Sequence, residues 1–383
     1  MKPLESLFRH HFQAAAAFEG FAPGRVNLIG EHTDYHEGLV MPGAIARGIQ
    51  MLGRGREDGV FRIRSTAFEE AHVFRLEEGM SESAGWGRRA EGIVRLLADE
   101  LAGPLRGMDL LLDADLPLGG GLSSSAASMA AIALALGQVN GLSFERRALA
   151  RSMQQAEHRF AGVKCGLMDQ LAVLLGQPNC ALKLDCRTLE IEPVAMPEAW
   201  AVLVLDTSVR HDLASSQYNQ RQLECARALT KMQNYRPEIK TLRDATWGDL
   251  ERLQGSLDAL AFARARHVIA ENERVEQAAQ AIKQRDARRV GELFAASHLS
   301  LRDDYAVSCE ALDTLAEAAW AAPGCIGARM TGGGFGGCTV NLVEEAQVAA
   351  FLEQVQHRFH AVFGRLAGVT QSRLGAGAWV RAR

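Results

Sequence analysis

The feature that most constrains the fold is a glycine- and serine-rich stretch that runs directly into a long segment of mostly small and apolar residues. Residues 117–125 read Pro-Leu-Gly-Gly-Gly-Leu-Ser-Ser-Ser, and no proline interrupts residues 126–139. Glycines let the backbone approach a ligand closely, serines can cap a helix, and a helix start with free N–H groups suits phosphate. The stretch predicts a phosphate-binding loop that opens a helix. It lacks the Gly-Lys-Ser/Thr of a Walker A loop, and a tight turn with an ordinary serine cap has the same local pattern.

A second glycine cluster formally matches the dinucleotide-binding pattern through Gly332, Gly334 and Gly337. That pattern needs a strand before it and a helix after it, whereas residues 338–343 are apolar and β-branched, as in a strand. We therefore reject a Rossmann motif. The cluster indicates either a loop whose backbone approaches a ligand or a glycine turn between strands.

A third stretch, residues 22–35, places Arg25, Glu31, His32 and Asp34 among turn residues. These side chains can donate and accept hydrogen bonds in several directions, which suits a polyhydroxylated ligand, although a solvated charged loop is also compatible. The spacing of His32 and His36 does not make a zinc site, because no Glu follows the first histidine.

A carboxylate, Asp169, lies just before the apolar run 171–175. Beside apolar residues it must either find a cation or take a raised pKa, and both are ways of making a functional acid or base. The alternative is a helix-starting Asp that is satisfied by backbone N–H groups.

The length of 383 residues and a hydrophobic content of 48% favour two domains with ample cores. Strand-like runs at 60–65 and 108–112 mix with helical ones in the first half, and a strand near 198–205 follows a proline-rich turn. Helical patterns cover 215–233 and 257–285, and residues 376–380 suit a closing strand. We expect an α+β fold with an N-terminal lobe over 1–197 and a C-terminal lobe over 198–383.

Composition excludes several classes of protein. With 42 Lys plus Arg against 46 Asp plus Glu, the formal charge is −4, and the scattered basic residues make no stripe for nucleic acid. No apolar run reaches the roughly 18 residues of a membrane span, and the N-terminal residues lack the apolar core of a signal peptide. Seven cysteines without CxxC spacing suit reduced thiols. We expect a soluble, cytoplasmic protein.

Several stretches, taken in order, resemble the GHMP family of small-molecule kinases, in particular its members that act on galactose. They are residues 24–35, 117–126, 263–275, 297–305 and 327–338. The resemblance implies a two-lobed α+β GHMP-kinase architecture with the active site in the cleft between the lobes. It also implies ATP-dependent phosphorylation of D-galactose at the anomeric C1 hydroxyl, with Mg²⁺ as cofactor and a monomeric enzyme.

The resemblance implies a role for each matching residue. Asp169 corresponds to the catalytic aspartate and Arg25 to the arginine beside it. Ser125 and Glu157 correspond to the magnesium ligands. Sugar contacts are implied for Glu31, His32, Asp34, Gly166 and Tyr218. Nucleotide contacts are implied for Gly119, Gly120, Gly121, Leu122, Ser123, Ser124 and Ser125.

Two alternatives stay open at this point. A related sugar-1-kinase acting on galacturonate, N-acetylgalactosamine or arabinose would share every motif, and the departures from the family pattern at His36, Gly43 and Arg47 lie beside the sugar loop. A non-catalytic galactose sensor is disfavoured because residues 122–127 are uninterrupted.

Overall fold

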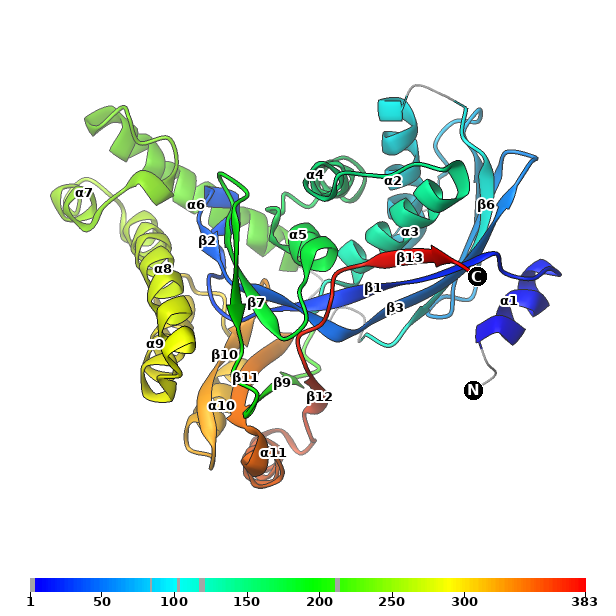
Figure 1. Ribbon diagram of the computed structural model, residues 1–383. Helices are drawn as coiled ribbons and strands as arrows, with labels where there is room; N and C mark the ends of the chain where they lie inside the picture. Colours follow the sequence, from blue (N-terminus) through cyan, green and yellow to red (C-terminus); the bar gives the residue numbers. More distant parts are fainter. Residues whose placement is uncertain (1–3, 83–84, 102–103, 117–120, 211–213) are drawn as a thin grey trace.

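The computed structural model describes residues 4–82, 85–101, 104–116, 121–210 and 214–383 (Figure 1). Within these ranges the strands form three β-sheets, against which helices pack. None of the helices within the described ranges is long and apolar enough to cross a membrane.

The largest sheet has six strands in the order β13-β1-β3-β6-β4-β5. Neighbouring strands are antiparallel except β4 and β6, which are parallel. In β4, Phe61, Ile63 and Ser65 are buried and alternate with more exposed residues, as expected for a strand with one face on the core. The strands are β1 (Phe18–Asn27), β3 (Pro42–Arg56), β4 (Val60–Ser65), β5 (His72–Arg75), β6 (Gly107–Ala114) and β13 (Trp379–Ala382).

Three helices pack on this sheet: α2 (Trp86–Leu101), α3 (Ser124–Asn140) and α5 (Met168–Leu175). Helix α4 (Arg146–Ala156) packs in turn on α2 and α5. Helix α3 is apolar around most of its circumference, and such a helix belongs inside a protein. It lies against β1 and β3 and also packs on α2 and α5. On the opposite face, α1 (Leu4–Phe12) packs Phe8 and Phe12 on Leu52 and Leu111.

A second sheet has the order β10-β11-β9-β12 and is antiparallel throughout. Helix α9 packs on β10, as does α10, while α10 also contacts α11. A small third sheet has the order β2-β7-β8. The strands of these two sheets are β2 (Leu39–Val40), β7 (Cys180–Asp185), β8 (Ile191–Ala195), β9 (Trp200–Asp206), β10 (Cys325–Thr331), β11 (Cys338–Glu344) and β12 (Gly368–Ser372).

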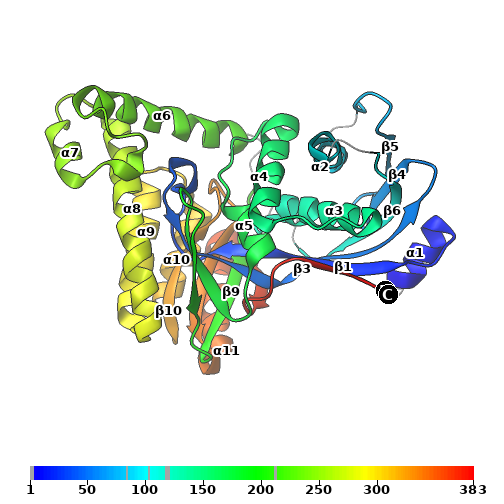
Figure 2. The same cartoon turned by 45° about the horizontal axis from the view of Figure 1, so that its top comes forward.

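Long helices form the remaining part of the molecule. In Figure 2, α6 runs across the top from the neighbourhood of α7 towards α4, while α8 and α9 lie side by side below α7. Helix α6 thereby carries side chains of the second half of the chain towards the helices of the first. The helices are α6 (Ala214–Tyr235), α7 (Trp247–Arg252), α8 (Ala259–Gln284), α9 (Ala287–Asp303), α10 (Glu310–Trp320) and α11 (Val348–Phe363).

Most of the helix and strand positions expected from the sequence are confirmed. The predicted strands appear as β4, β6 and β9, and the predicted helices as α6 and α8. The second glycine cluster joins β10 to β11, which confirms that it is not a Rossmann motif. The closing strand exists but begins at Trp379 and pairs with β1, so the end of the chain returns to the first sheet. A division at 197/198 remains a prediction.

Candidate active site

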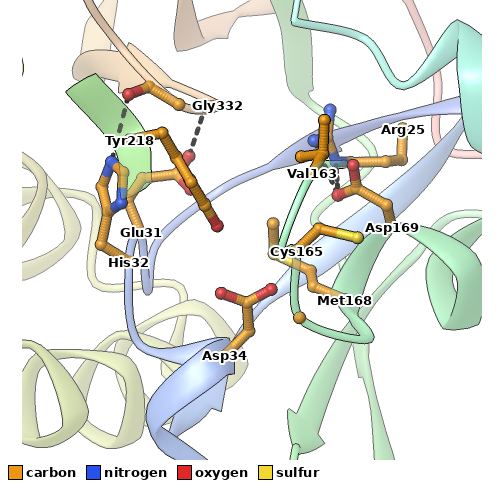
Figure 3. A pocket seen from close by; sticks show the side chains of 12 residues that line it. Arg25, Glu31, His32, Asp34, Val163, Cys165, Met168, Asp169, Tyr218 and Gly332 are labelled. Atoms are coloured by element: carbon orange, nitrogen blue, oxygen red, sulfur yellow. Dashed lines mark hydrogen bonds and ion pairs between the residues drawn. The ribbon is translucent and has the colours of Figure 1, made fainter. Parts of the chain in front are cut away.

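A cavity of about 170 Å³ lies between residues from the two halves of the chain (Figure 3). Its volume suits a molecule of the size of a monosaccharide, and polar side chains face it from several directions. Tyr218, from α6, and the loop between β10 and β11 bring in the C-terminal half. The lining residues are Arg25, Glu31, His32, Asp34, Val163, Cys165, Gly166, Met168, Asp169, Tyr218, Gly332 and Gly333.

One side of the cavity is formed by an oriented carboxylate. Asp169, the second residue of α5, accepts a hydrogen bond at Oδ1 from Arg25 Nε at 2.7 Å. Its Oδ2 accepts from Ser123 Oγ at 2.5 Å. Arg25 is almost fully buried at the end of β1 and also bonds the carbonyl of Gly121. The carboxylate is thus fixed through both oxygens by two side chains, rather than by backbone N–H groups at the helix start.

Ser123 corrects one expectation from the sequence. It precedes α3 in the left-handed region with φ of 57°, and its hydroxyl makes no capping bond to the helix. The hydroxyl is directed to Asp169 instead. A non-glycine residue in this conformation carries strain, and such strain is typical of functional loops. The backbone N–H groups at the start of α3 are thereby left without a serine side-chain cap at Ser123.

The opposite side of the cavity carries Glu31 and His32 (Figure 3). Glu31 is only 2% exposed, and both its oxygens are engaged: Oε1 accepts from the Gly332 N–H at 2.7 Å, and Oε2 accepts from Asn27 Nδ2 at 2.9 Å. Gly332 therefore fixes the orientation of the Glu31 carboxylate from the second glycine cluster.

His32 is a neutral imidazole with a defined tautomer. Burial lowers its pKa to about 3. Nε2 lies 3.2 Å from the carbonyl of Gly333, which can only accept, so Nε2 carries the proton. Nδ1 then accepts from the Tyr35 hydroxyl at 2.8 Å, and that hydroxyl accepts in turn from Tyr305 at 2.8 Å. Hydrogen bonds with one consistent direction thus hold the ring in place.

Asp34 lies between these two sides and points into the cavity (Figure 3). Burial, together with the nearby Asp169 and Glu31 carboxylates, raises the pKa of Asp34 to about 7. Gly166 gives it room, because a Cβ at that position would lie 2.0 Å from Asp34 Oδ2. The Tyr218 hydroxyl also points into the cavity from the other side.

A second cavity, of about 290 Å³ and mostly apolar, borders the start of α3. Ser124, Ser125 and Ser128 line it, together with Phe68 and Trp86, whose rings stack at 5.2 Å. Stacked aromatic rings beside a helix start offer a flat surface next to a phosphate-binding end.

Arg89 also lines this second cavity, and its Nε lies 3.3 Å from Oε2 of the buried Glu157. The Ser125 hydroxyl thus lines the second cavity, and the Glu157 carboxylate is connected to the cavity through Arg89. Hard oxygen donors of this kind are what Mg²⁺ takes from a protein.

The structure brings together all the predicted catalytic and sugar-contacting residues around the first cavity. Ser124 and Ser125 line the second cavity, and Gly121, Leu122 and Ser123 lie between β6 and α3. Gly119 and Gly120 lie outside the described residues. Sequence reasoning did not assign Val163, Cys165, Met168, Gly332 or Gly333 to the site. The glycine cluster around Gly332 was the one available signal for two of them.

Comparison with known proteins agrees with this geometry. Models of the GHMP kinases N terminal domain and of the GHMP kinases C terminal region match residues 88–177 and 278–361. A mevalonate kinase structure shares the fold at a TM-score of 0.66 and 14% identity. The fold and the site thus define a GHMP kinase.

More specific matches follow. The model of the galactokinase galactose-binding signature matches residues 6–54. Galactokinases of Chloroflexus aurantiacus and Homo sapiens are 43% and 41% identical to the chain, over 98% and 92% of it and 97% and 90% of their own lengths. A crystal structure of Lactococcus lactis galactokinase complexed with galactose superimposes with a TM-score of 0.94 at 34% identity, covering 98% of both chains. The chain belongs to the galactokinase family of GHMP kinases.

Proposed function

We infer that the chain is an enzyme that transfers the γ-phosphoryl group of ATP to the anomeric C1 hydroxyl of D-galactose, giving galactose 1-phosphate and ADP. The observation that carries the inference is the Arg25–Asp169–Ser123 arrangement facing Asp34, Glu31 and Tyr218 across a cavity of about 170 Å³. The relatives named galactokinase, similar over nearly the whole chain, agree with it. No comparison favours galacturonate, N-acetylgalactosamine or arabinose as the sugar, or a sensor without catalysis.

In the proposed reaction, the C1 oxygen attacks the γ-phosphorus while the bond from phosphorus to the ADP oxygen breaks. Asp169 accepts the proton of the C1 hydroxyl, because Arg25 and Ser123 hold its carboxylate facing the cavity. The remaining hydroxyls of the sugar are bound by Asp34, Tyr218, Glu31 and His32, which fix the sugar in the attacking orientation.

The nucleotide is proposed to lie along the start of α3. Its phosphates face the backbone N–H groups at the start of α3, which receive no capping bond from the Ser123 side chain and where the helix dipole also favours negative charge. The adenine base fits the second cavity, on the Phe68–Trp86 pair.

Mg²⁺ is proposed to bind at Ser125 and Glu157. The donor chemistry fits, because Mg²⁺ bound with a nucleotide takes few protein ligands and completes its shell with phosphates and water. When bound, the ion neutralises the charge of the transferring phosphoryl group. We further propose that the enzyme works as a monomer in the cytoplasm.

The test is ADP release with Mg-ATP across galactose, glucose, N-acetylgalactosamine, galacturonate and arabinose, for the wild type and for Asp169→Asn. We expect galactose to give the highest kcat/KM. Asp169→Asn should lose at least about a hundredfold in kcat, the usual contribution of a general base, while calorimetry still detects galactose binding. Near-normal turnover in the variant would remove the base role from Asp169, and a preference for another sugar would contradict the proposed substrate.

A further inference from the structure

Behind the sugar cavity, a chain of buried polar side chains leads from the helices α8 and α9 to Glu31. Its members are Glu271 on α8, Ser297 on α9 and Arg329 on β10, here called the Glu271–Ser297–Arg329 network. We propose that Glu271 is a positioning residue for sugar binding, which fixes the Glu31 carboxylate in the cavity through this network. The identity of the sugar rests on the proposed function.

The end of the network nearest the cavity is Arg329, whose side chain is fully buried. Its Nη1 donates to the carbonyls of Asn27 and Leu28 at 3.3 and 3.2 Å and lies 3.4 Å from Glu31 Oε1. Its Nη2 is buried and has no hydrogen-bond partner among the described residues. Arg329 therefore contacts Glu31 through Nη1, while its Nη2 has no acceptor among the described residues.

The other end of the network is Glu271, which is also fully buried. Its Oε1 accepts from the Gly30 N–H at 3.0 Å and from Ser297 Oγ at 2.6 Å. Ser297 Oγ in turn accepts from Arg329 Nε at 3.1 Å. Glu271 thus contacts the segment around Glu31 in two ways. It accepts directly from the backbone N–H of Gly30, one residue before Glu31, and it is connected to the Glu31 carboxylate through Ser297 and Arg329.

The backbone that Glu271 contacts has a demanding conformation. Gly30 has φ of 97° and His32 φ of 62°. A Cβ at Gly30 would lie 2.7 Å from both the Leu39 carbonyl oxygen and the Val40 Cα, so the loop is tightly packed there. A hydrogen bond to the Gly30 N–H from an anchored carboxylate therefore stabilises the one conformation in which Glu31 faces the cavity.

The charges of the network balance. Glu271 Oε2 accepts from Arg274 Nε at 2.6 Å, so two carboxylates, Glu31 and Glu271, face two arginines, Arg274 and Arg329. Burial opposes ionisation of Glu271, but Arg274, His267 and Arg329 outweigh it and lower its pKa to about 2. Removing the charge of Glu271 leaves Glu31 as the remaining carboxylate for Arg329. We expect Glu31 then to turn towards Arg329 and away from Gly332 and the sugar.

The first experiment compares Glu271→Gln with a matched control, Asp109→Asn. Asp109 is fully buried on β6 and is paired with Arg54, Arg56 and Arg62, none of which lines the cavity. Both variants should lower Tm. Only Glu271→Gln should raise the Kd and KM for galactose, by about tenfold, the value of one charge-assisted hydrogen bond, with the KM for ATP unchanged.

A second variant, Ser297→Ala, makes a smaller change and tests the connection through the network. It should weaken galactose binding less than Glu271→Gln does. The double variant should bind no more weakly than Glu271→Gln alone, because both changes break the same connection. Full additivity of the two effects would show that Ser297 and Glu271 act independently, and would overturn the network.

Hydrogen exchange of the backbone over residues 28–36, without any sugar, separates this proposal from the proposed function. We expect faster exchange there in Glu271→Gln than in the wild type or Asp109→Asn. If the wild type binds no galactose, the proposed function fails, while faster exchange in Glu271→Gln alone still supports the positioning role. Unchanged exchange, with a galactose Kd equal to that of the wild type, would overturn the positioning role.

Discussion

At the scale of single residues, Asp34 combines a proposed role in sugar binding with a cost in folding stability. Burial and two neighbouring carboxylates raise its pKa from 3.8 to about 7. A carboxyl group whose pKa is raised on folding stabilises the native state below its unfolded pKa, and this contribution is lost as the pH rises through the folded value. Between about pH 4 and 7, Asp34 therefore makes the protein progressively less stable, and above pH 7 its cost is constant.

Asp34→Asn removes that cost, and it also removes a charged acceptor for the sugar. We expect the variant to have a higher Tm than the wild type at pH 8, and the difference to shrink as the pH falls to 4. Galactose binding at pH 8 should weaken. The measurement is thermal unfolding across this pH range, with Glu78→Gln, at an exposed position, as the control. A Tm difference independent of pH would contradict the raised pKa.

Tyr218 should contribute one neutral hydrogen bond to the sugar from α6. Tyr218→Phe is expected to weaken galactose binding by about 0.5–1.5 kcal/mol, or about two- to tenfold in Kd. Calorimetry measures this, and Tyr235→Phe, an exposed tyrosine at the end of the same helix, is the control. Equal affinities of Tyr218→Phe and the wild type would remove Tyr218 from the site.

The residues that line the cavity were largely predictable from the sequence, whereas the residues that position these side chains by hydrogen bonds were not. Arg25, Glu31, His32 and Asp34 stand close together in the sequence, so their density was itself a signal. Arg329 is 298 residues from Glu31, and no local pattern connects the two. The pattern allowed the serines of residues 123–125 to cap α3, but the Ser123 hydroxyl donates to Asp169 instead, because the tertiary contact with a carboxylate replaces the local one.

At the scale of elements, the second cavity lies between the starts of α2 and α3 and strands β3, β4 and β6 of the first sheet. Trp86 begins α2, and Ser124 and Ser125 begin α3, so the two helix starts meet at the proposed nucleotide site. Trp86→Ala should raise the KM for ATP about fivefold, the lower range for stacking of a base on an aromatic ring. The Kd for galactose should not change. The readout is steady-state kinetics at saturating galactose.

The matched control for this variant is Trp247→Ala, because Trp247 is a partly exposed tryptophan on α7, away from the second cavity. Equal KM values for ATP in Trp86→Ala and Trp247→Ala would place the base elsewhere. The second cavity could not be predicted from the sequence, since no motif marks the segments that contain Phe68 and Trp86. The two rings meet through the packing of α2 on the sheet.

At the scale of the whole molecule, β13 joins the end of the chain to its beginning. Residues Trp379–Ala382 pair with Phe18–Phe21, and Arg381 forms an ion pair with Glu19, with Nη2 2.6 Å from Oε1. Deleting residues 379–383 should lower Tm by several degrees and promote aggregation, because the deletion exposes the edge of β1. Arg381→Ala, which keeps the strand and removes an exposed ion pair and the contact of the guanidinium with the Trp379 ring, should change Tm little. An unchanged Tm after the deletion would show that β13 adds no stability.

The core shows the same mixing of the two halves of the chain. One hydrophobic cluster contains Leu110 and Ile132 from the first half and Val204, Phe294 and Val340 from the second. Local sequence patterns predicted the elements β4, β6, β9, α6 and α8, because a run of apolar or periodic residues marks each of them. Which sheet the last strand joins depends on long-range packing, and only the structure shows it.

The return of β13 to β1 has a consequence for how the protein is made. During translation β1 is made long before β13, so the edge of β1 that pairs with β13 lacks this partner until β13 has been synthesised. Arg25 and Asn27 lie on that same strand. A nascent or prematurely terminated chain therefore exposes an unpaired strand edge beside the incomplete proposed site. Such an edge can pair with other chains, so the nascent chain needs protection from aggregation.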